Sequence, residues 1–378
     1  MKIRNGYTLR KIADTTYLLP VGQNVATHHR GIALNETGVF LVHALQKDIA
    51  PAALLRLMMT HFEAEADELP AFREDLNTFL TSLRQLDILE ETIYNHMHNQ
   101  QFQFGPLRIG YNGPAELLHP SLLDFACEDG VIDQNWIIIP EVPRTAPVGE
   151  LLIKTSDIAI YQNDTHYILA YPDPKGLCEC QITLDGSCAY FFCSDCEECT
   201  MRETLFHAFR FTFLLIAQKN GLVLLHSASL LHQGKAWLFS GQSGTGKSTH
   251  TNLWHEQFDS HLLNGDLNMV GMSGDTPIVY GIPWCGTSEI YTTDSYPLGG
   301  IILLKQDSFN HLVPLTDSQR QLYIQQRLIS PCWTEPMLDD NLAIVRAIVP
   351  QIQVFRYLCT KEPDAAIQMR AIIENTTC

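Results

Sequence analysis

The chain has 378 residues, enough for two or three domains, and its apolar (46%) and charged (18%) fractions are ordinary for a globular protein. Its net charge of −17 disfavours nucleic acid as a partner, because no stretch gathers enough basic residues to offset repulsion from phosphates. No apolar run is long enough to span a membrane, and polar residues interrupt residues 1–20, so we expect neither a membrane partner nor a signal peptide. We therefore expect a cytoplasmic protein whose 11 cysteines are reduced.

Residues 1–95 are expected to form a small winged-helix-like domain of two strands followed by three helices. The runs YTLRKI (7–12) and TYLLPV (16–21) predict the strands, because they are extended and rich in β-branched and aromatic residues. Asn35, in the stretch LNETG, is expected to cap the first helix, and Asp48 to cap the second.

The third helix of this domain has the clearest pattern. Its apolar residues recur at alternating steps of four and three, which places on one face Phe72, Leu76, Phe79, Leu83 and Leu86. The segment 1–95 has 9 basic and 12 acidic residues, a charge of −3, which argues against DNA binding by this fold.

The order of these elements, the LNETG turn and the run FREDLNTFLTSLRQLDIL resemble the PqqD family over roughly residues 3–92. That family provides the peptide-recognition domain of systems that modify ribosomally made peptides. The resemblance implies that the leader of a precursor peptide is the partner, and that it adds as a strand beside the small sheet, against the third helix.

The middle of the chain is expected to be a linker (96–106) and then a β-rich, cysteine-rich subdomain (107–200). Short runs rich in Ile, Val, Tyr and Phe, separated by turn residues, predict its strands. The stretch CSDCEEC has the spacing of metal ligands, so Cys193, Cys196 and Cys199 are candidate zinc ligands, while packing as small apolar side chains is the alternative.

Residues 201–378 are expected to form a nucleotide-binding core. A helix (201–219) and two strands (221–230 and 235–240) precede GQSGTGKST, and a helix (247–258) follows it. A strand, a glycine-rich loop and a helix in this order are the context of the phosphate-binding loop G-x-x-x-x-G-K-[ST].

The loop residues have distinct expected roles. Its glycines let backbone N–H groups surround phosphate oxygens, Lys247 reaches the β- and γ-phosphates of ATP, and the Ser248 hydroxyl binds Mg²⁺. The candidate ligands of the nucleotide are Gly241, Ser243, Gly244, Thr245, Gly246, Lys247, Ser248 and Thr249.

Two further residues complete the candidate site. Asp266 follows the apolar pair Leu262–Leu263, at the carboxyl end of an expected short strand, where it can bind Mg²⁺ or take a proton from a hydroxyl. His226 lies on the strand before the loop, and the 15 residues from it to Gly241 allow a hairpin that returns it to the loop. For each, a purely structural role is the alternative.

The LLHSASL strand, the GQSGTGKST loop and Asp266 together resemble the HPr kinase/phosphorylase family and its relative, the ATP-type phosphoenolpyruvate carboxykinase. The family has a pair of acids where this chain has Gly265 and Asp266, so only the second acid is kept. The stretch from 279 to 304 resembles HPr-kinase-like proteins of peptide-modification clusters. That likeness implies that Trp284 and Gly286 line the site and that Glu289 is a second acid, while core packing of Trp284 is the alternative.

The resulting expectation is a multidomain α/β protein in which a PqqD-like domain and a β-rich subdomain precede an HPr-kinase-like core. Its expected function is transfer of the γ-phosphoryl group of ATP to a Ser or Thr of a precursor peptide, with Asp266, His226 and Lys247 as catalytic residues. A small-molecule kinase and a non-catalytic, nucleotide-sensing peptide binder are the alternatives. The candidates for contact with the transferred group are Arg320, Arg327 and Arg346. The resemblance to HPr kinases also implies that the protein forms a homo-oligomer.

Overall fold

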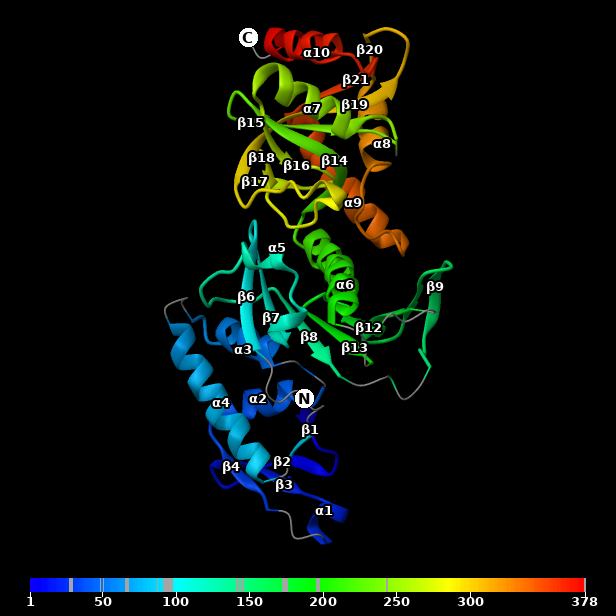
Figure 1. Cartoon of the computed structure of the whole chain (residues 1–378). Coiled ribbons are helices and arrows are strands. Elements are labelled where there is room, and N and C mark those ends of the chain that lie inside the picture. The colour runs from blue at the N-terminus through cyan, green and yellow to red at the C-terminus, as the bar shows by residue number, and fades with distance from the viewer. Residues whose placement is uncertain are drawn as a thin grey trace.

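The computed structural model describes residues 1–26, 30–47, 49, 51–64, 68–86, 88–90, 98–140, 143, 146–171, 176–194, 198–242 and 244–376. The chain runs from an N-terminal domain through a middle sheet to a C-terminal core, at the opposite end of the molecule (Figure 1). Helices and several β-sheets occur together, so the predicted multidomain α/β class is confirmed. None of the described helices has the length and apolar character needed to cross a membrane.

The N-terminal domain consists of two small sheets and the helices around them. Its elements are β1 (Lys2–Ile3), β2 (Tyr7–Ile12), β3 (Thr15–Pro20), α1 (Gln23–Ala26), β4 (Ile32–Leu34), α2 (Glu36–Ala44), α3 (Pro51–His61), α4 (Leu69–Gln85) and β5 (Leu89–Glu90). Strands β2, β3 and β4 form an antiparallel sheet, and β1 pairs with β5.

The local predictions for this domain are confirmed where the structure describes them. The Asn35 side chain caps α2 by accepting a hydrogen bond from the Gly38 N–H at 2.8 Å. Leu76 and Leu83 of α4 are buried in the core of the domain, as their spacing predicts. Asp48, the expected cap of α3, lies outside the described residues.

The middle of the chain forms an eight-stranded sheet in the order β6-β7-β8-β13-β12-β11-β10-β9. Its strands are β6 (His98–Phe104), β7 (Leu107–Gly113), β8 (Gln134–Ile139), β9 (Glu150–Lys154), β10 (Ala159–Gln162), β11 (His166–Ala170), β12 (Leu177–Thr183) and β13 (Cys188–Cys193), with the short helix α5 (Pro120–Leu123) between β7 and β8. Neighbouring strands pair antiparallel except at β7–β8 and β8–β13, which are parallel.

The linker expected at residues 96–106 is corrected by this sheet. Residues 98–104 form β6, because Phe102 and Phe104 alternate with polar residues and are both fully buried. The polar Gln101, which precedes Phe102, is also buried, and it donates to the Asp129 carboxylate at 3.0 Å and accepts from the Gly130 N–H at 2.9 Å.

The C-terminal core is built around a second sheet. Its elements are α6 (Glu198–Lys219), β14 (Val223–His232), β15 (Lys235–Ser240), α7 (Lys247–Phe258), β16 (His261–Asn264), β17 (Leu267–Ser273), β18 (Thr276–Tyr280), β19 (Ser295–Gln306), β20 (His311–Val313), α8 (Asp317–Gln325), α9 (Glu335–Ile348), β21 (Gln353–Cys359) and α10 (Pro363–Thr376). Because β15 pairs with both β14 and β19, the strands β14, β17, β18, β19 and β15 close into a ring. Strands β15, β19 and β21 are mutually parallel.

The middle sheet and the C-terminal core share one hydrophobic core. Helix α6 lies between them (Figure 1), and a single cluster of buried side chains joins Phe102 of β6, Phe209 of α6, Met269 of β17 and Trp284. The boundary expected at residue 200 falls within α6, so the two parts do not have separate cores at that point.

The N-terminal domain meets the middle sheet through two polar contacts and a small cavity lined by apolar side chains of both parts. Arg73 forms an ion pair with Asp129 at 2.7 Å, and Arg56 donates to the backbone oxygen of Asp133 at 3.0 Å. Both acceptors lie in the segment between α5 and β8.

Candidate nucleotide-binding site

A glycine-rich turn joins the end of β15 to the start of α7. Gly244 and Gly246 have φ angles of +77° and +93°, which only glycine adopts readily. Gly246 precedes α7, and no side chain in the described part of the chain caps that helix. Its first N–H groups and its dipole therefore face the turn, which suits a phosphate group.

Seven of the eight predicted loop residues lie on this turn and the first turn of α7: Gly241, Gly244, Thr245, Gly246, Lys247, Ser248 and Thr249. Ser243 lies outside the described residues. The Thr245 hydroxyl donates to the Gln242 oxygen at 2.7 Å, and the Gln306 side chain donates to the Gly244 oxygen at 2.9 Å. These bonds hold the turn against β19.

His226 and Asp266 meet beside the turn. The antiparallel register of β14 and β17 pairs His226 with Leu267, which brings the neighbouring Asp266 to the histidine. His226 Nε2 lies 3.2 Å from Asp266 Oδ1, and each side chain is 31% exposed. The hairpin expected from the sequence does return His226 to the loop, because β14 pairs with β15 and the Ser240 hydroxyl donates to the His226 oxygen at 2.7 Å.

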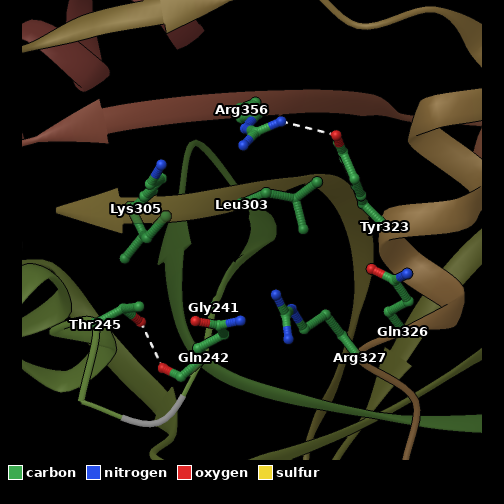
Figure 2. Close-up of a pocket in the computed structure, with 10 residues that line it drawn as sticks. Gly241, Gln242, Thr245, Leu303, Lys305, Tyr323, Gln326, Arg327 and Arg356 are labelled. Carbon is green, nitrogen blue, oxygen red and sulfur yellow. Dashed lines mark hydrogen bonds between the residues drawn. The ribbon is translucent and has the colours of Figure 1, made fainter. Parts of the chain in front are cut away.

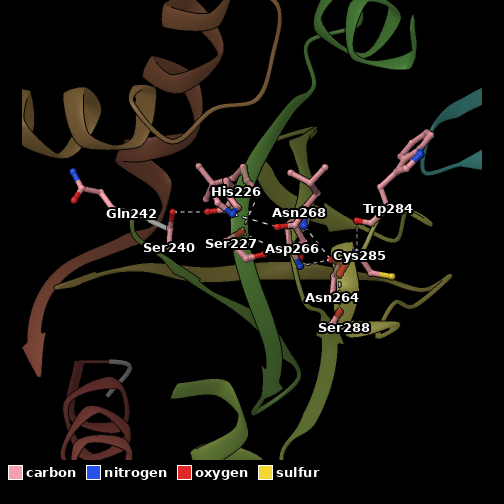
Figure 3. A network of polar contacts seen from close by, with 12 residues as sticks. His226, Ser227, Ser240, Gln242, Asn264, Asp266, Asn268, Trp284, Cys285 and Ser288 are labelled. Carbon is pink, nitrogen blue, oxygen red and sulfur yellow. Dashed lines mark hydrogen bonds and ion pairs between the residues drawn. The ribbon is translucent and has the colours of Figure 1, made fainter. Parts of the chain in front are cut away.

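A buried polar network fixes the backbone around Asp266 (Figure 3). The Asn264 side chain accepts from the Asp266 N–H at 2.9 Å and from the Leu267 N–H at 3.1 Å, so it forms the turn that presents the carboxylate. The Asp266 oxygen accepts from the Ser227 N–H at 2.9 Å. Asn268 donates to the Ser227 oxygen at 2.7 Å, which ties β17 to β14.

The charges around Asp266 favour its ionised form. The hydrogen bond with His226 holds the pKa of Asp266 below its usual value, and the positive charges of Arg210 and Lys247 act in the same direction. Burial lowers the pKa of Lys247, and Asp266 opposes that shift. The site therefore joins a carboxylate, an imidazole and an ammonium group at the N-terminus of α7.

Arg210 belongs to this site although the sequence analysis did not single it out. It lies on α6, burial lowers its pKa, and Asp266 counteracts that shift. Its Nε is buried and has no hydrogen-bond partner among the described residues. The sequence did contain a signal for it. Arg210 is the one charged residue between Glu203 and Lys219 in a mostly apolar stretch, and a charge in such a stretch is expected to have a specific role.

Gly265 stands where the resembling family has its first acid, and a neighbouring loop fills the space that a side chain there would need. A Cβ atom on Gly265 would lie 2.0 Å from Ser288 Oγ and 2.4 Å from Ser288 Cβ. Gly286, at φ +63°, lies on the other side of the same loop, and a Cβ there would be 3.0 Å from the Asp266 Cβ. The loop thus packs against both residues, and the site contains one acid at this turn where the resembling family has two.

Four other residues expected near the phosphates do not lie in the site. Trp284 is buried in the shared core, and its Nε1 donates to the Phe206 oxygen at 3.0 Å, so the structural alternative applies to it. Glu289 is exposed, and no described contact joins it to Asp266. Arg320 forms an ion pair with Asp317 at 3.6 Å, and Arg346 is exposed on α9.

Arg327 is the member of the arginine group that does lie at the site. Its backbone oxygen accepts from the His226 N–H at 3.0 Å, and its charge acts on Lys247. Together with Arg356, which the sequence analysis missed, it lines a cavity of about 380 Å³ at the start of the loop (Figure 2). A second cavity, of about 280 Å³, is lined by Ser248 of α7 and by Ser288.

The donor atoms at this site fit Mg²⁺, which prefers a few carboxylate and hydroxyl oxygens together with phosphates. The Ser248 hydroxyl, in the first turn of α7, and the Asp266 carboxylate, whose pKa the charge of Lys247 lowers, are the two expected ligands, and both supply oxygen atoms. Zinc at the cysteine cluster stays a prediction: Cys193 is buried on β13, but Cys196 and the Cys199 side chain lie outside the described residues. Among the residues that are described, no group of three potential ligands could hold a metal ion.

The turn, α7 and the paired His226 and Asp266 define a candidate site of the phosphate-binding-loop class. No family model matches the chain, and no curated protein matches it. The structure is similar to that of TbiB1 in complex with the TbiA(beta) leader peptide, with 20% identity, over 25% of this chain and 99% of TbiB1, at a TM-score of 0.20.

It is also similar to the Hpr(Ser) kinase/phosphatase from Coxiella burnetii, with 13% identity, over 41% of this chain and 95% of that one, at a TM-score of 0.24. These matches, each over less than half of this chain, are to the two kinds of protein that the sequence resembles.

Proposed function

We propose that this protein is an ATP-dependent kinase that transfers the γ-phosphoryl group to a Ser or Thr hydroxyl of a ribosomally made precursor peptide. The observation that supports this most is the meeting of Asp266, His226 and Lys247 at the N-terminus of α7. Phosphoryl transfer requires a phosphate cradle, a cation at the β- and γ-phosphates and a group that receives the hydroxyl proton. The turn before α7 would be the cradle, Lys247 the cation and Asp266 the proton acceptor.

The proposed reaction begins with ATP phosphates on the turn from Gly241 to Thr249. The acceptor oxygen attacks the γ-phosphorus, the bond to the bridging oxygen breaks, and ADP leaves. Asp266 stays ionised at neutral pH because its pKa is low, so it can orient the hydroxyl and accept its proton. His226, 3.2 Å from Asp266, holds the carboxylate in place.

Mg²⁺ bound by Ser248 and Asp266 would neutralise part of the negative charge on the phosphates. Lys247 would act on the same charge from the first turn of α7, where burial strengthens its interaction with anions. Arg210 and Arg327 are positioned to add positive charge near the transferred group.

The peptide part of the proposal depends on the N-terminal domain. Among the described strands, β4 pairs only with β3, so one edge of the small sheet is open to an added strand. The leader of a precursor would bind there, as the leader-bound TbiB1 suggests, and would raise the local concentration of the acceptor at the core. We infer a cytoplasmic location, where ATP and newly made peptides are both present.

A second candidate function has one observation in its favour. Position 265 lacks a carboxylate, and Ser288 occupies the space that a side chain would need. A protein that binds the peptide and senses nucleotide without transfer would tolerate this loss.

Intact mass spectrometry separates the two functions. The protein is incubated with Mg-ATP and the short peptides encoded beside its gene, and Asp266→Asn serves as the matched variant. Kinase function predicts a gain of one phosphoryl group on a peptide that Asp266→Asn does not produce. Tight peptide binding without any gain would contradict the kinase and favour the sensor, or a small-molecule acceptor.

A further inference from the structure

The cavity at the start of the phosphate-binding loop gathers three cations. It lies toward the carboxyl ends of the parallel strands β15, β19 and β21, where α/β proteins commonly bind ligands. Lys305 of β19, Arg327 after α8 and Arg356 of β21 line it (Figure 2). Within the described part of the chain, no carboxylate forms an ion pair with any of the three.

Two of these cations are held in place by the protein. Arg356 Nη1 donates to the Tyr323 hydroxyl at 2.8 Å, and its guanidinium lies 4.9 Å from the centre of the Tyr323 ring. Arg327 is fixed through its backbone, which donates to the Ile324 oxygen at 2.9 Å and accepts from the His226 N–H. A ligand would therefore find the Arg356 guanidinium and the Arg327 backbone already ordered, which reduces the entropy lost on binding.

An anion would relieve the repulsion among these charges. The repulsion also acts on Lys247: burial lowers the pKa of this lysine, and the positive charge of Arg327 lowers it further. Guanidinium groups match the geometry of carboxylate and phosphate oxygens, with which they form paired, charge-assisted hydrogen bonds. The cavity is thus suited to an oxyanion.

The nucleotide is not the best match for this cavity. Lys247 and Ser248, which are expected to contact the β- and γ-phosphates and Mg²⁺, do not line it. Gly241 and Thr245 of the loop do line it, but polar and apolar side chains share its walls and three of them are positively charged, whereas a nucleobase prefers mostly apolar walls. The backbone bond from His226 to Arg327 places the cavity directly beside the pair that would receive the acceptor hydroxyl.

We propose that this cavity binds the carboxylate of an acidic side chain that lies close in sequence to the acceptor Ser or Thr, an inference that rests on the proposed kinase function. With a net charge of −17, most of the protein surface repels an acidic peptide. The cavity offers such a peptide one place where its charge is matched, which gives selectivity for the segment around the acceptor.

The test uses synthetic peptides that share one Ser and differ only in the neighbouring residues, each of which is Asp, Glu, Asn, Gln or Lys in turn. Phosphorylation rates are measured with the full chain, with Lys305→Gln and with Arg356→Gln. The matched control is Arg346→Gln, which removes the same charge from an exposed position on α9. Lys305 is exposed, so its replacement tests the cavity without threatening the fold.

At one neighbouring position, an acid is expected to raise kcat/KM about tenfold or more over its amide. Both cavity variants should reduce that preference while leaving the KM for ATP unchanged, and Arg346→Gln should keep it. Lys305→Glu should favour a Lys at the same position. Equal rates for acid and amide would overturn the inference while leaving the kinase intact.

A raised KM for ATP with the acid preference unchanged would also overturn the inference, because it would assign the cavity to the nucleotide. Failure to phosphorylate any synthetic peptide or any peptide encoded beside the gene would contradict the proposed function itself, and the inference with it.

Discussion

Replacing Gly265 by Ala tests the packing that excludes the second acid. The new Cβ would overlap Ser288 Oγ and Cβ, at 2.0 Å and 2.4 Å, where ordinary contacts begin near 3.4 Å. Rotating the Ser288 side chain would relieve only the first overlap. It would also break the bonds of the hydroxyl to the Cys285 oxygen at 2.7 Å and from the Ile290 N–H at 3.2 Å. Overpacking of this kind costs about 1–3 kcal/mol.

The assay is urea unfolding followed by tryptophan fluorescence, which reports on the right part of the molecule. The 5 tryptophans lie at 136, 237, 254, 284 and 333, so all of them belong to the middle sheet and the C-terminal core. Gly265→Ala should lower the free energy of unfolding by about 1–3 kcal/mol. Ser288→Gly, which removes both clashing atoms, is the partner in a double-mutant cycle.

The double variant should be less destabilised than the sum of the two single variants, because the clash exists only when both side chains are present. Additive effects, or a Gly265→Ala protein as stable as the wild type, would refute the packing described here. The same reasoning predicts that Gly265→Asp alone does not restore a two-acid site, since the loop from Cys285 to Ile290 must move first.

Three further outcomes test the proposed site. Lys247→Ala should abolish phosphoryl transfer while Lys219→Ala, a charge change at the end of α6, does not; unchanged transfer in Lys247→Ala would remove the central claim. His226→Gln should move the acid-side loss of activity to higher pH. The reason is that the His226 hydrogen bond keeps Asp266 ionised below its usual pKa; a pH profile that does not move would argue against that bond. Deleting residues 1–95 should leave nucleotide binding intact but slow phosphorylation of the full precursor, and equal rates would show that the N-terminal domain does not recognise the substrate.

Local patterns in the sequence were sufficient for the phosphate-binding turn and the elements around it. The predicted helix 247–258 has the same bounds as α7, because a glycine with positive φ begins it and its own residues define its length. The return of His226 to the loop also followed from local information, since one hairpin, β14–β15, joins it to Gly241, but its contact with Asp266 depends on the pairing of β14 with β17.

The remaining site residues depend on contacts that are distant in sequence. Arg210 reaches Asp266 from α6, and Arg356 reaches the cavity from β21, so only the packing of those elements brings them there. The closure of position 265 depends on the Ser288 loop in the same way. In β6 the signal was present, as the alternation of Phe102 and Phe104, but polar residues around it resembled a linker.

The two interfaces between the parts of the molecule differ in kind, and this difference affects how such proteins can diversify in evolution. Where the structure describes it, the N-terminal domain meets the middle sheet through an ion pair at Arg73, a hydrogen bond at Arg56 and a few apolar side chains, whereas the middle sheet shares a large core of buried aromatic side chains with the C-terminal core. Gene recombination could therefore exchange the first domain with little change to the rest, and under the proposed function this would redirect the protein to other precursor peptides. The middle sheet and the core must instead be inherited together, because separating them would expose Phe209 and Trp284.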